Sequence, residues 1–177
     1  MGSSDESSTG GRLAIREAVP GDGPAIAAIH SDNAAYYVEL APDLFRAPDP
    51  DGLAEFVDPS PEDNSPASVF LVAQDRSAVV GYLLAELVSP TPTDRYQSST
   101  DLNEVRLFIH ALAVLQACWR RGIAGRLVEA AEEWGRERGA AIVLCDTWLE
   151  SPVSLPFWEE RMGYSRRSVR MRKRLDC

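Results

Sequence analysis

Three arginines crowd the point where an apolar segment runs into a helix-forming one. Arg120, Arg121 and Arg126 stand beside Gly122 and Gly125. The N-terminus of a helix carries partial positive charge and favours acidic side chains, so arginines at that end cost stability unless an anion binds there. Glycines and free backbone N–H groups allow a phosphate to approach such a turn closely. The sequence therefore predicts a phosphate-binding turn.

The spacing of this turn separates it from two common phosphate-binding loops. It lacks the Lys-Ser/Thr ending of a nucleoside triphosphate loop, and Gly-x-x-Gly is not the Gly-x-Gly-x-x-Gly of dinucleotide-binding folds. The turn resembles the acyl-CoA pyrophosphate loop of the GNAT family of N-acetyltransferases, which usually reads Gln/Arg-x-x-Gly-x-Gly/Ala after a strand ending in Ala-Val. Ala113 and Val114 supply that strand end, whereas Trp119 stands where the family has Gln or Arg.

The resemblance extends over residues 12–175. Residues 13–22 resemble the family's opening motif, and residues 69–74 and 78–87, with Val80-Gly81-Tyr82, resemble its second and third strands. The last motif is matched by a series of residues in the right order: Thr147, Trp148, Ser151, Ser154, Phe157, Trp158, Gly163 and Tyr164.

This resemblance implies transfer of an acetyl group from acetyl-CoA to an amine, by direct attack in a ternary complex and without a metal. A backbone amide of the strand segment that contains Leu112 would polarise the thioester oxygen. The residues that the resemblance places against CoA are Leu112, Ala113, Val114, Trp119, Arg120, Arg121, Gly122, Ile123, Ala124, Gly125 and Arg126, with Ser154, Phe157 and Trp158 from the last motif.

Two residues of the predicted central strand could remove a proton from the amine. An imidazole ordinarily titrates near pH 6.5, which suits proton transfer at neutral pH, so His110 is the leading candidate for the general base. It is expected to share a face with Phe108 and Leu112, and a hydrogen-bonded core histidine is the alternative. Glu104 is the second candidate, although six residues span about 20 Å of extended strand, and its alternative is a solvated side chain.

The sequence departs from the family pattern at the position of the general acid. Many members protonate the departing thiolate with a Tyr of the last motif. Counting forward from Ser154 places Trp158 there, and counting back from Gly163 places Glu159 there. An indole N–H is not a usable acid, so Glu159 is the side-chain candidate. The alternatives are protonation by water and departure of CoA as the anion.

Charge and aromatic residues indicate the acceptor. Residues 1–105 contain 5 basic and 18 acidic residues, and the remainder contains 13 basic and 9 acidic ones, which sums to the net charge of −9. The acidic half suits a cationic amine, and solubility of surface loops is the alternative. The candidate acceptor-binding residues are Tyr36, Tyr37, Glu39, His110 and Trp148. The alternative for the two tyrosines is that one packs in the core and the other is exposed, and the alternative for Trp148 is a core or pantetheine-wall residue.

Composition is typical of one compact cytoplasmic domain. No apolar run reaches membrane-spanning length, and residues 1–11 are Ser/Gly-rich and are expected to form a disordered tail. Cys118, Cys145 and Cys177 form neither a disulfide framework nor a metal spacing. The arginines of residues 166–174 alternate along a predicted strand, which together with the acidic net charge argues against nucleic acid. A homodimer is left open.

The expected fold is an α/β domain with a mixed, mostly antiparallel twisted sheet of about six or seven strands, flanked by helices, with a CoA cleft beside the central strand. The strands are expected at residues 13–17, 68–74, 78–87, 104–114, 141–148 and 164–175. Helices are expected at residues 23–30, 33–40, 50–57, 122–138 and 153–161, and a long polar loop at 88–102.

Two other functions remain open at this level. A non-catalytic acyl-CoA-binding module would keep the phosphate turn but would need no acid or base, which fits the missing Tyr and the Trp at position 119. An acyltransferase with another donor, such as a longer acyl-CoA or an acylated carrier, would keep the chemistry. Gly-x-x-Gly also occurs in nucleic-acid-clamping modules, but the preceding strand argues against that.

Overall fold

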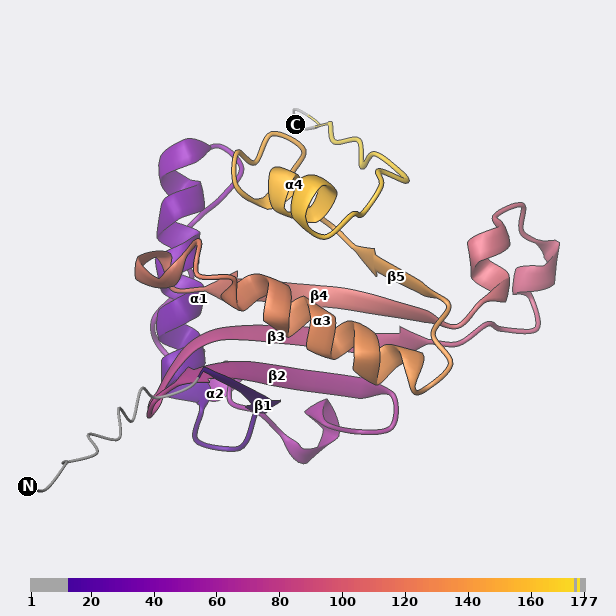
Figure 1. Ribbon diagram of the computed structural model, residues 1–177. Helices are drawn as coiled ribbons and strands as arrows, with labels where there is room; N and C mark the ends of the chain where they lie inside the picture. The colour runs from indigo at the N-terminus through magenta and orange to yellow at the C-terminus, as the bar shows by residue number, and fades with distance from the viewer. Residues whose placement is uncertain (1–12, 174, 176–177) are drawn as a thin grey trace, which may run out of the picture. The chain divides into compact units, whose positions relative to one another are not determined.

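The computed structural model describes residues 13–173 and 175, and its centre is a sheet whose strands follow one another in chain order (Figure 1). The described part of the chain contains five strands: β1 (Ala14–Glu17), β2 (Ser68–Asp75), β3 (Ala78–Val88), β4 (Arg106–Val114) and β5 (Ile142–Cys145). Neighbouring strands are antiparallel from β1 to β4, and β5 lies parallel to β4. The prediction of a mixed, mostly antiparallel sheet is therefore confirmed.

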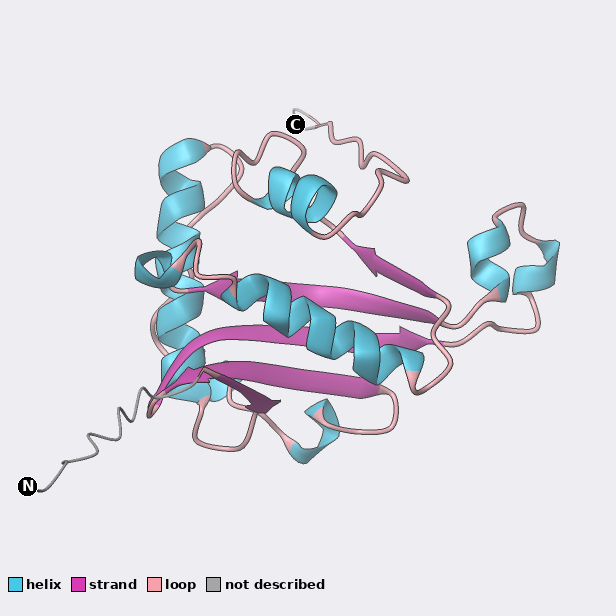
Figure 2. Ribbon diagram, viewed as in Figure 1, coloured by secondary structure: helices cyan, strands magenta, loops and turns pink. Residues whose placement is uncertain are grey.

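Two long helices cover the two faces of this sheet (Figure 2). Helix α1 (Gly23–Leu40) buries Ile26 and Ile29 against Phe70, Tyr82 and Ala113. Helix α3 (Ile123–Arg136) covers the other face with an apolar stripe: Ile123, Leu127, Val128 and Ala131 are all buried. Because β4 lies between both helices, its sequence is apolar on both faces, as expected for a central strand.

The remaining elements are short. They are α2 (Leu53–Phe56), α4 (Ser154–Pro156), the 3₁₀ turns η1 (Pro61–Asp63), η2 (Asp94–Tyr96), η3 (Thr100–Asn103) and η4 (Gln116–Cys118), and the π-helical turn η5 (Phe157–Arg161).

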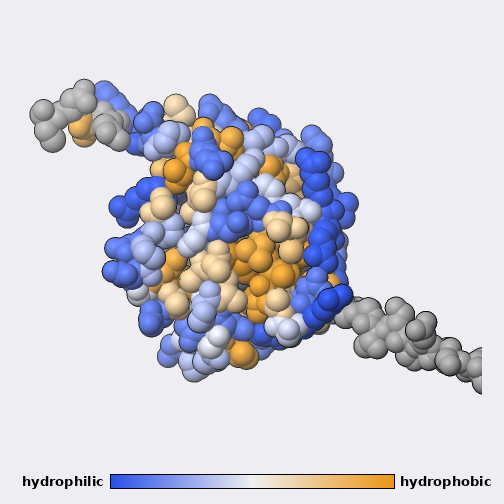
Figure 3. Space-filling view, turned by 90° about the vertical axis from the view of Figure 1, so that its left-hand side faces the viewer, coloured by the Kyte–Doolittle hydropathy of each residue, from blue (hydrophilic) through white to orange (hydrophobic). Residues whose placement is uncertain are grey.

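Figure 3 views the side on which α1 lies in Figure 1, and it shows hydrophobic residues gathered in a patch among hydrophilic ones.

Several predicted elements differ from the structure, and the differences with a clear physical cause concern α1, β4 and the C-terminal segment. The helices expected at 23–30 and 33–40 are one helix, because Asp32 and Asn33 direct their polar groups to β4 and the turn after it rather than breaking α1. The strand expected from Glu104 begins at Arg106, because the backbone N–H of Glu104 closes η3 by donating to Asp101.

The strand expected at 164–175 is absent from residues 164–173 and 175, so the sheet has fewer strands than the six or seven predicted. The alternating arginines of this segment form ion pairs instead of lining a strand face. Arg166 contacts Glu159, and Arg170 contacts Asp146 at 2.6 Å.

The chain divides into two compact units, the first ending at Cys145 and the second beginning at Asp146. A single domain over 12–175 stays a prediction. The tail expected at 1–11 and Cys177 lie outside the described residues. Among the described residues, no helix is long and apolar enough to cross a membrane.

Candidate functional site

One edge of β4 is open in its second half. Pairing with β5 ends at Ile109 and Cys145, so residues 110–114 face no described strand on that side. The N–H of Leu115 donates to the carbonyl of Val80 at 2.9 Å. Because hydrogen-bonded pairs alternate in an antiparallel ladder, Leu112 and Val114 turn their N–H and C=O groups away from β3, toward the open edge. The backbone amide of Leu112 thus points to the open edge, and its role in binding a thioester stays a prediction.

A β-bulge in β4 sets the side chains around His110. Leu84 pairs with Ala111 and Ala85 pairs with Ile109, so His110 is the extra residue. A bulge shifts the alternation of side chains by one position. His110 therefore shares a face with Phe108, whose ring centroid lies 4.9 Å away, whereas Leu112 points to the opposite face. The expectation that His110 and Leu112 share a face is wrong for this reason.

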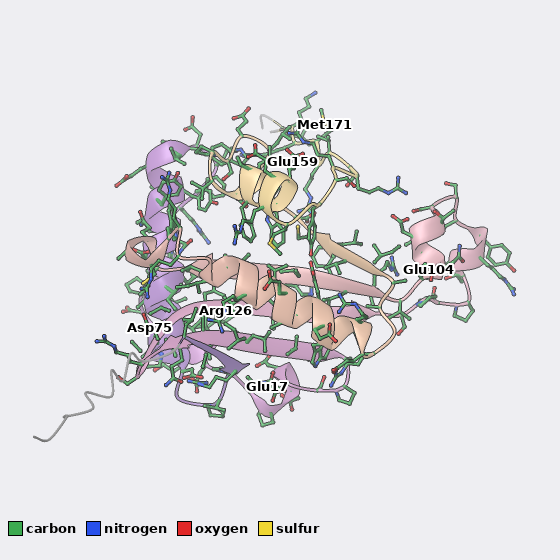
Figure 4. The ribbon with its side chains drawn as sticks, viewed as in Figure 1. Glu17, Asp75, Glu104, Arg126, Glu159 and Met171 are labelled. Atoms are coloured by element: carbon green, nitrogen blue, oxygen red, sulfur yellow. The ribbon has the colours of Figure 1, made fainter. Side chains whose placement is uncertain are left out.

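The side chain of His110 is 43% exposed, and its Nε2 lies 3.2 Å from Oε2 of Glu86, which is 54% exposed. The alternative of a core histidine is therefore wrong. Glu104 is exposed, lies outside β4, and stands at the opposite end of the sheet from Arg126 (Figure 4). The structure does not bring Glu104 to His110.

The turn between β4 and α3 has the backbone geometry of an anion site. Arg120 (φ 62°) and Gly122 (φ 77°) adopt left-handed conformations, and Gly122 is the N-cap of α3. The first turn of α3 has no capping side chain and no acidic residue. In the described part of the chain, the N–H groups of Ile123, Ala124 and Gly125 have no acceptor, as the first N–H groups of a helix lack intrahelical partners.

Exposed arginines flank these N–H groups in the chain. Arg126 lies in the first turn of α3 (Figure 4), and Arg120 and Arg121 stand directly before the N-cap Gly122. The guanidinium of Arg121 donates to the carboxylate of Asp75 at 2.7 Å, and this contact raises the pKa of Arg121. Positive charge and free N–H groups thus meet at one helix end, where the sequence predicts a phosphate.

Trp119 fixes the turn to α1 instead of reaching outward. Its Nε1 donates to the carbonyl of Val114 at 2.7 Å, and its ring contacts the ring of Tyr36 edge-on at 4.9 Å. The same carbonyl accepts a hydrogen bond from Asn33 at 2.9 Å. The indole occupies the Gln/Arg position of the family motif, so this departure supplies support for the loop backbone.

Sequence reasoning missed three residues that hold the turn: Asp32, Asn33 and Gln116. The carboxylate of Asp32 accepts from the backbone N–H of Gln116 at 2.7 Å, and the Gln116 side chain donates back to the Asp32 carbonyl at 2.8 Å. The available signal was an Asp-Asn pair within an otherwise helical segment. Such residues are disfavoured in a helix interior unless their side chains find other partners.

The three predicted acceptor residues on α1 have different surroundings. Tyr36 packs on Trp119, Tyr37 packs on Phe45 with ring centroids 5.1 Å apart, and Glu39 is exposed. A second histidine, His30, contacts the hydroxyl of Tyr82 through Nδ1 at 3.1 Å. Burial raises the pKa of Tyr82 to about 12, so this hydroxyl stays protonated at neutral pH.

The second unit holds the residues of the last motif. Ser154 contacts Thr147 through their hydroxyls at 2.6 Å, and its N–H donates to Oγ of Ser151 at 2.9 Å. Trp158 is buried, with its ring near those of Phe157 (5.0 Å) and Tyr164 (4.9 Å). The environment of Trp158 is that of a core residue in this unit.

Glu159 and Trp148 belong to the same unit. The carboxylate of Glu159 accepts two hydrogen bonds from Arg166, and this contact lowers the pKa of Glu159. A carboxyl group with a lowered pKa is deprotonated at neutral pH, which disfavours Glu159 as a proton donor. The carbonyl of Trp148 accepts from the N–H of Ser151 at 3.0 Å.

A family model described as the acetyltransferase (GNAT) family matches residues 29–164. This range includes β4, the turn and α3. The chain therefore belongs to this family, and it is an N-acetyltransferase by family. CoA is the co-substrate expected for its members. No curated protein shows a significant sequence match to the chain.

Solved structures share the fold at low identity. A variant of the BH1408 protein from Bacillus halodurans is 22% identical, with a TM-score of 0.75, over 92% of this chain and 99% of that one. Aminoglycoside acetyltransferase meta-AAC0020 from an uncultured soil metagenomic sample, in complex with sisomicin, is 20% identical (TM-score 0.61; 93% and 97%). Aminoglycoside N-acetyltransferase AAC(6')-Iy, in complex with CoA, is 19% identical (TM-score 0.63; 96% and 99%).

Proposed function

We propose that the protein transfers the acetyl group of acetyl-CoA to a small cationic amine by direct attack in a ternary complex. The observation that carries this proposal is the α3 terminus, where free N–H groups meet exposed arginines at the end of an open β4 edge. The pyrophosphate of CoA would bind at this turn. The thioester end would then lie along β4, where the amide of Leu112 can donate to its oxygen.

The chemistry follows from the groups on the two sides of β4. His110 takes a proton from the ammonium group, and the free amine attacks the thioester carbonyl carbon. The C–N bond forms, the negative charge on oxygen is stabilised by the Leu112 amide, and the C–S bond then breaks. CoA leaves as a thiolate that takes a proton from water, and the second proton of the attacking nitrogen passes to the hydroxide that this leaves. Glu159 is not used as the acid, because its carboxylate accepts two hydrogen bonds from Arg166.

The acceptor is proposed to be a cationic metabolite or antibiotic. Two structural neighbours are aminoglycoside acetyltransferases, one in complex with sisomicin, and this supports an amine of that class. The acidic excess of the N-terminal half is weaker support for a cationic acceptor than the composition alone suggests. Several of those acids already bind within the protein: Asp22, Asp32, Asp58, Asp63 and Asp75. Glu39 and Glu86 are exposed, and Glu86 also contacts His110.

Release of CoA thiol from acetyl-CoA across a panel of cationic, neutral and acidic amines tests the function. We expect turnover with cationic amines and a kcat/KM that falls as salt rises, because exposed charges are screened. His110→Ala should lower kcat by roughly 10²–10⁴ and change the CoA dissociation constant only a few fold. Glu39→Gln should raise KM for the amine more than KM for acetyl-CoA.

Three results would contradict parts of this proposal. CoA binding without turnover on any amine would favour the non-catalytic module. Turnover with a longer acyl-CoA in preference to acetyl-CoA would change the donor. A preferred acceptor that is neutral or acidic, at rates indifferent to salt, would overturn the cationic assignment.

A further inference from the structure

The bulge in β4 brings a carboxylate to His110 from the neighbouring strand. Glu86 of β3 pairs in register with Phe108, two positions before the bulged histidine. The Nε2 of His110 and the Oε2 of Glu86 lie 3.2 Å apart, which is within hydrogen-bonding distance. Glu86, Phe108 and His110 lie on the same face of the sheet as α1.

This contact selects one form of the imidazole ring. An ionised carboxylate only accepts hydrogen bonds, so the nitrogen that faces Glu86 must carry a proton. With the proton on Nε2, the neutral ring has its free lone pair on Nδ1. Nδ1 is then the atom that can accept a proton from an ammonium group.

Of the other ionisable groups near this face, two on α1 have partners other than His110 and Glu86, whereas one on β4 has a nitrogen without a partner among the described residues. On α1, His30 contacts Tyr82 and Asp32 contacts Gln116. On β4, the side chain of Arg106 is buried and its Nε has no hydrogen-bond partner among the described residues. The residues of β5 in register with Arg106 and Phe108 are Ile142 and Leu144, which carry no charge.

We propose that Glu86 is a positioning residue for His110: it holds the proton on Nε2, orients the ring, and stabilises the imidazolium that forms when the amine is deprotonated. The proposal rests on the proposed function of His110 as the general base. Glu86 acts through the histidine and does not contact the reacting atoms.

The tautomer can be measured without turnover. The chain has two histidines, so His30 is an internal control in every ¹⁵N spectrum of the imidazole rings. At high pH the Nε2–H form of His110 should dominate in the wild type, and Glu86→Ala should shift His110 toward a mixture while His30 is unchanged. Glu129→Gln, which neutralises an exposed acid of α3, should leave both rings unchanged.

Kinetics separate positioning from substrate binding. Glu86→Gln should lower kcat about tenfold with little change in KM for the amine, since the base is less well held. Glu86→Asp should recover part of kcat. The double variant His110→Ala, Glu86→Ala should be no slower than His110→Ala, because the residues act as a unit.

Two outcomes would overturn the positioning role. An unchanged His110 tautomer in Glu86→Ala would show that the contact does not exist in solution. A raised KM for the amine with unchanged kcat would make Glu86 an acceptor-binding residue. If the wild type acetylates no amine, the proposed function fails, whereas the tautomer measurement still decides whether Glu86 holds the ring.

Discussion

The two long helices of the first unit begin in opposite ways. At α1, the carboxylate of Asp58 accepts from the N–H groups of Gly21 and Gly23 at 2.8 and 2.7 Å. The following Pro24 has no N–H, and the next two N–H groups donate to the carbonyl of Asp22. The donors at this helix start are therefore all used within the protein.

The start of α3 is left open. It has a glycine N-cap, no acid in its first turn and an exposed arginine there, while the corresponding N–H groups have no acceptor among the described residues. Both helices face the same physical requirement at their N-termini. α1 meets it with the carboxylate of Asp58 and the backbone carbonyl of Asp22, whereas the donors of α3 are left to an acceptor from outside. The contrast supports the proposal that CoA binds at the start of α3 and not at the start of α1.

Gly122→Asp tests this contrast, and of the variants considered it should have the largest effect, a loss of CoA affinity. The new carboxylate would stand where phosphate must bind, and it would also have to adopt a left-handed backbone conformation (φ 77°). We expect the CoA dissociation constant to rise at least about 100-fold, measured by titration calorimetry.

Gly139→Asp is the matched control for that variant. Gly139 also has a positive φ (85°), has no atom within 4 Å of the position a Cβ would take, and follows the opposite end of α3. It introduces the same charge and a similar backbone strain away from the turn. CoA affinity should stay within a few fold of wild type. Equal losses in both variants would mean that α3 is generally disrupted and that the turn is not specifically the site.

Asp22→Asn should have the next largest effect, on stability and not on CoA affinity. Asp22 is buried, receives two hydrogen bonds from Arg16 at 2.7 and 2.9 Å, and accepts from the N–H of Val19 at 2.9 Å. Losing the charged partner should cost about 1–3 kcal/mol of unfolding free energy at pH 7 in denaturant titrations. A tenfold loss of CoA affinity in the folded variant would contradict the assignment of α1 as a closed terminus.

The difference in unfolding free energy between wild type and Asp22→Asn should change with pH in a defined direction. The hydrogen bond from Arg16 lowers the pKa of Asp22 below its ordinary value of 3.8. A group with a lowered pKa in the folded state stabilises the protein above its unfolded-state pKa and loses that contribution as pH falls through the folded value. The difference between wild type and Asp22→Asn should therefore be constant near neutrality and shrink below about pH 3.8. A difference that grew on acidification would exclude the Arg16 contact as its cause.

The strand, turn and helix around Gly122 could be predicted because their signal is local. Glycines, arginines and an apolar strand lie within about fifteen residues, and the structure confirms the strand, the turn and α3 in that order. The bulge at His110 could not be predicted, because it depends on the register of β4 against β3. Glu86, 24 residues away in sequence, lies beside His110 only through that register. The prediction of a strand at 164–175 was wrong for a related reason. Alternating side chains in the sequence predict a strand, but a strand forms only where it can pair with another strand.

Asp75→Asn should have the smallest effect and is the sharpest probe of how charge is arranged at the open terminus. The carboxylate of Asp75 contacts the guanidinium of Arg121, so it would compete with a phosphate for that group, and it adds a negative charge near it. Exposed ion pairs contribute little, so we expect CoA to bind at most about threefold more tightly at low salt, and the gain to vanish at high salt. Glu55→Gln, which neutralises an exposed acid of α2, should leave affinity unchanged. Weaker binding by Asp75→Asn would mean that Asp75 serves to position Arg121 for phosphate, and that the open helix terminus, like the closed one, depends on a carboxylate from its own chain.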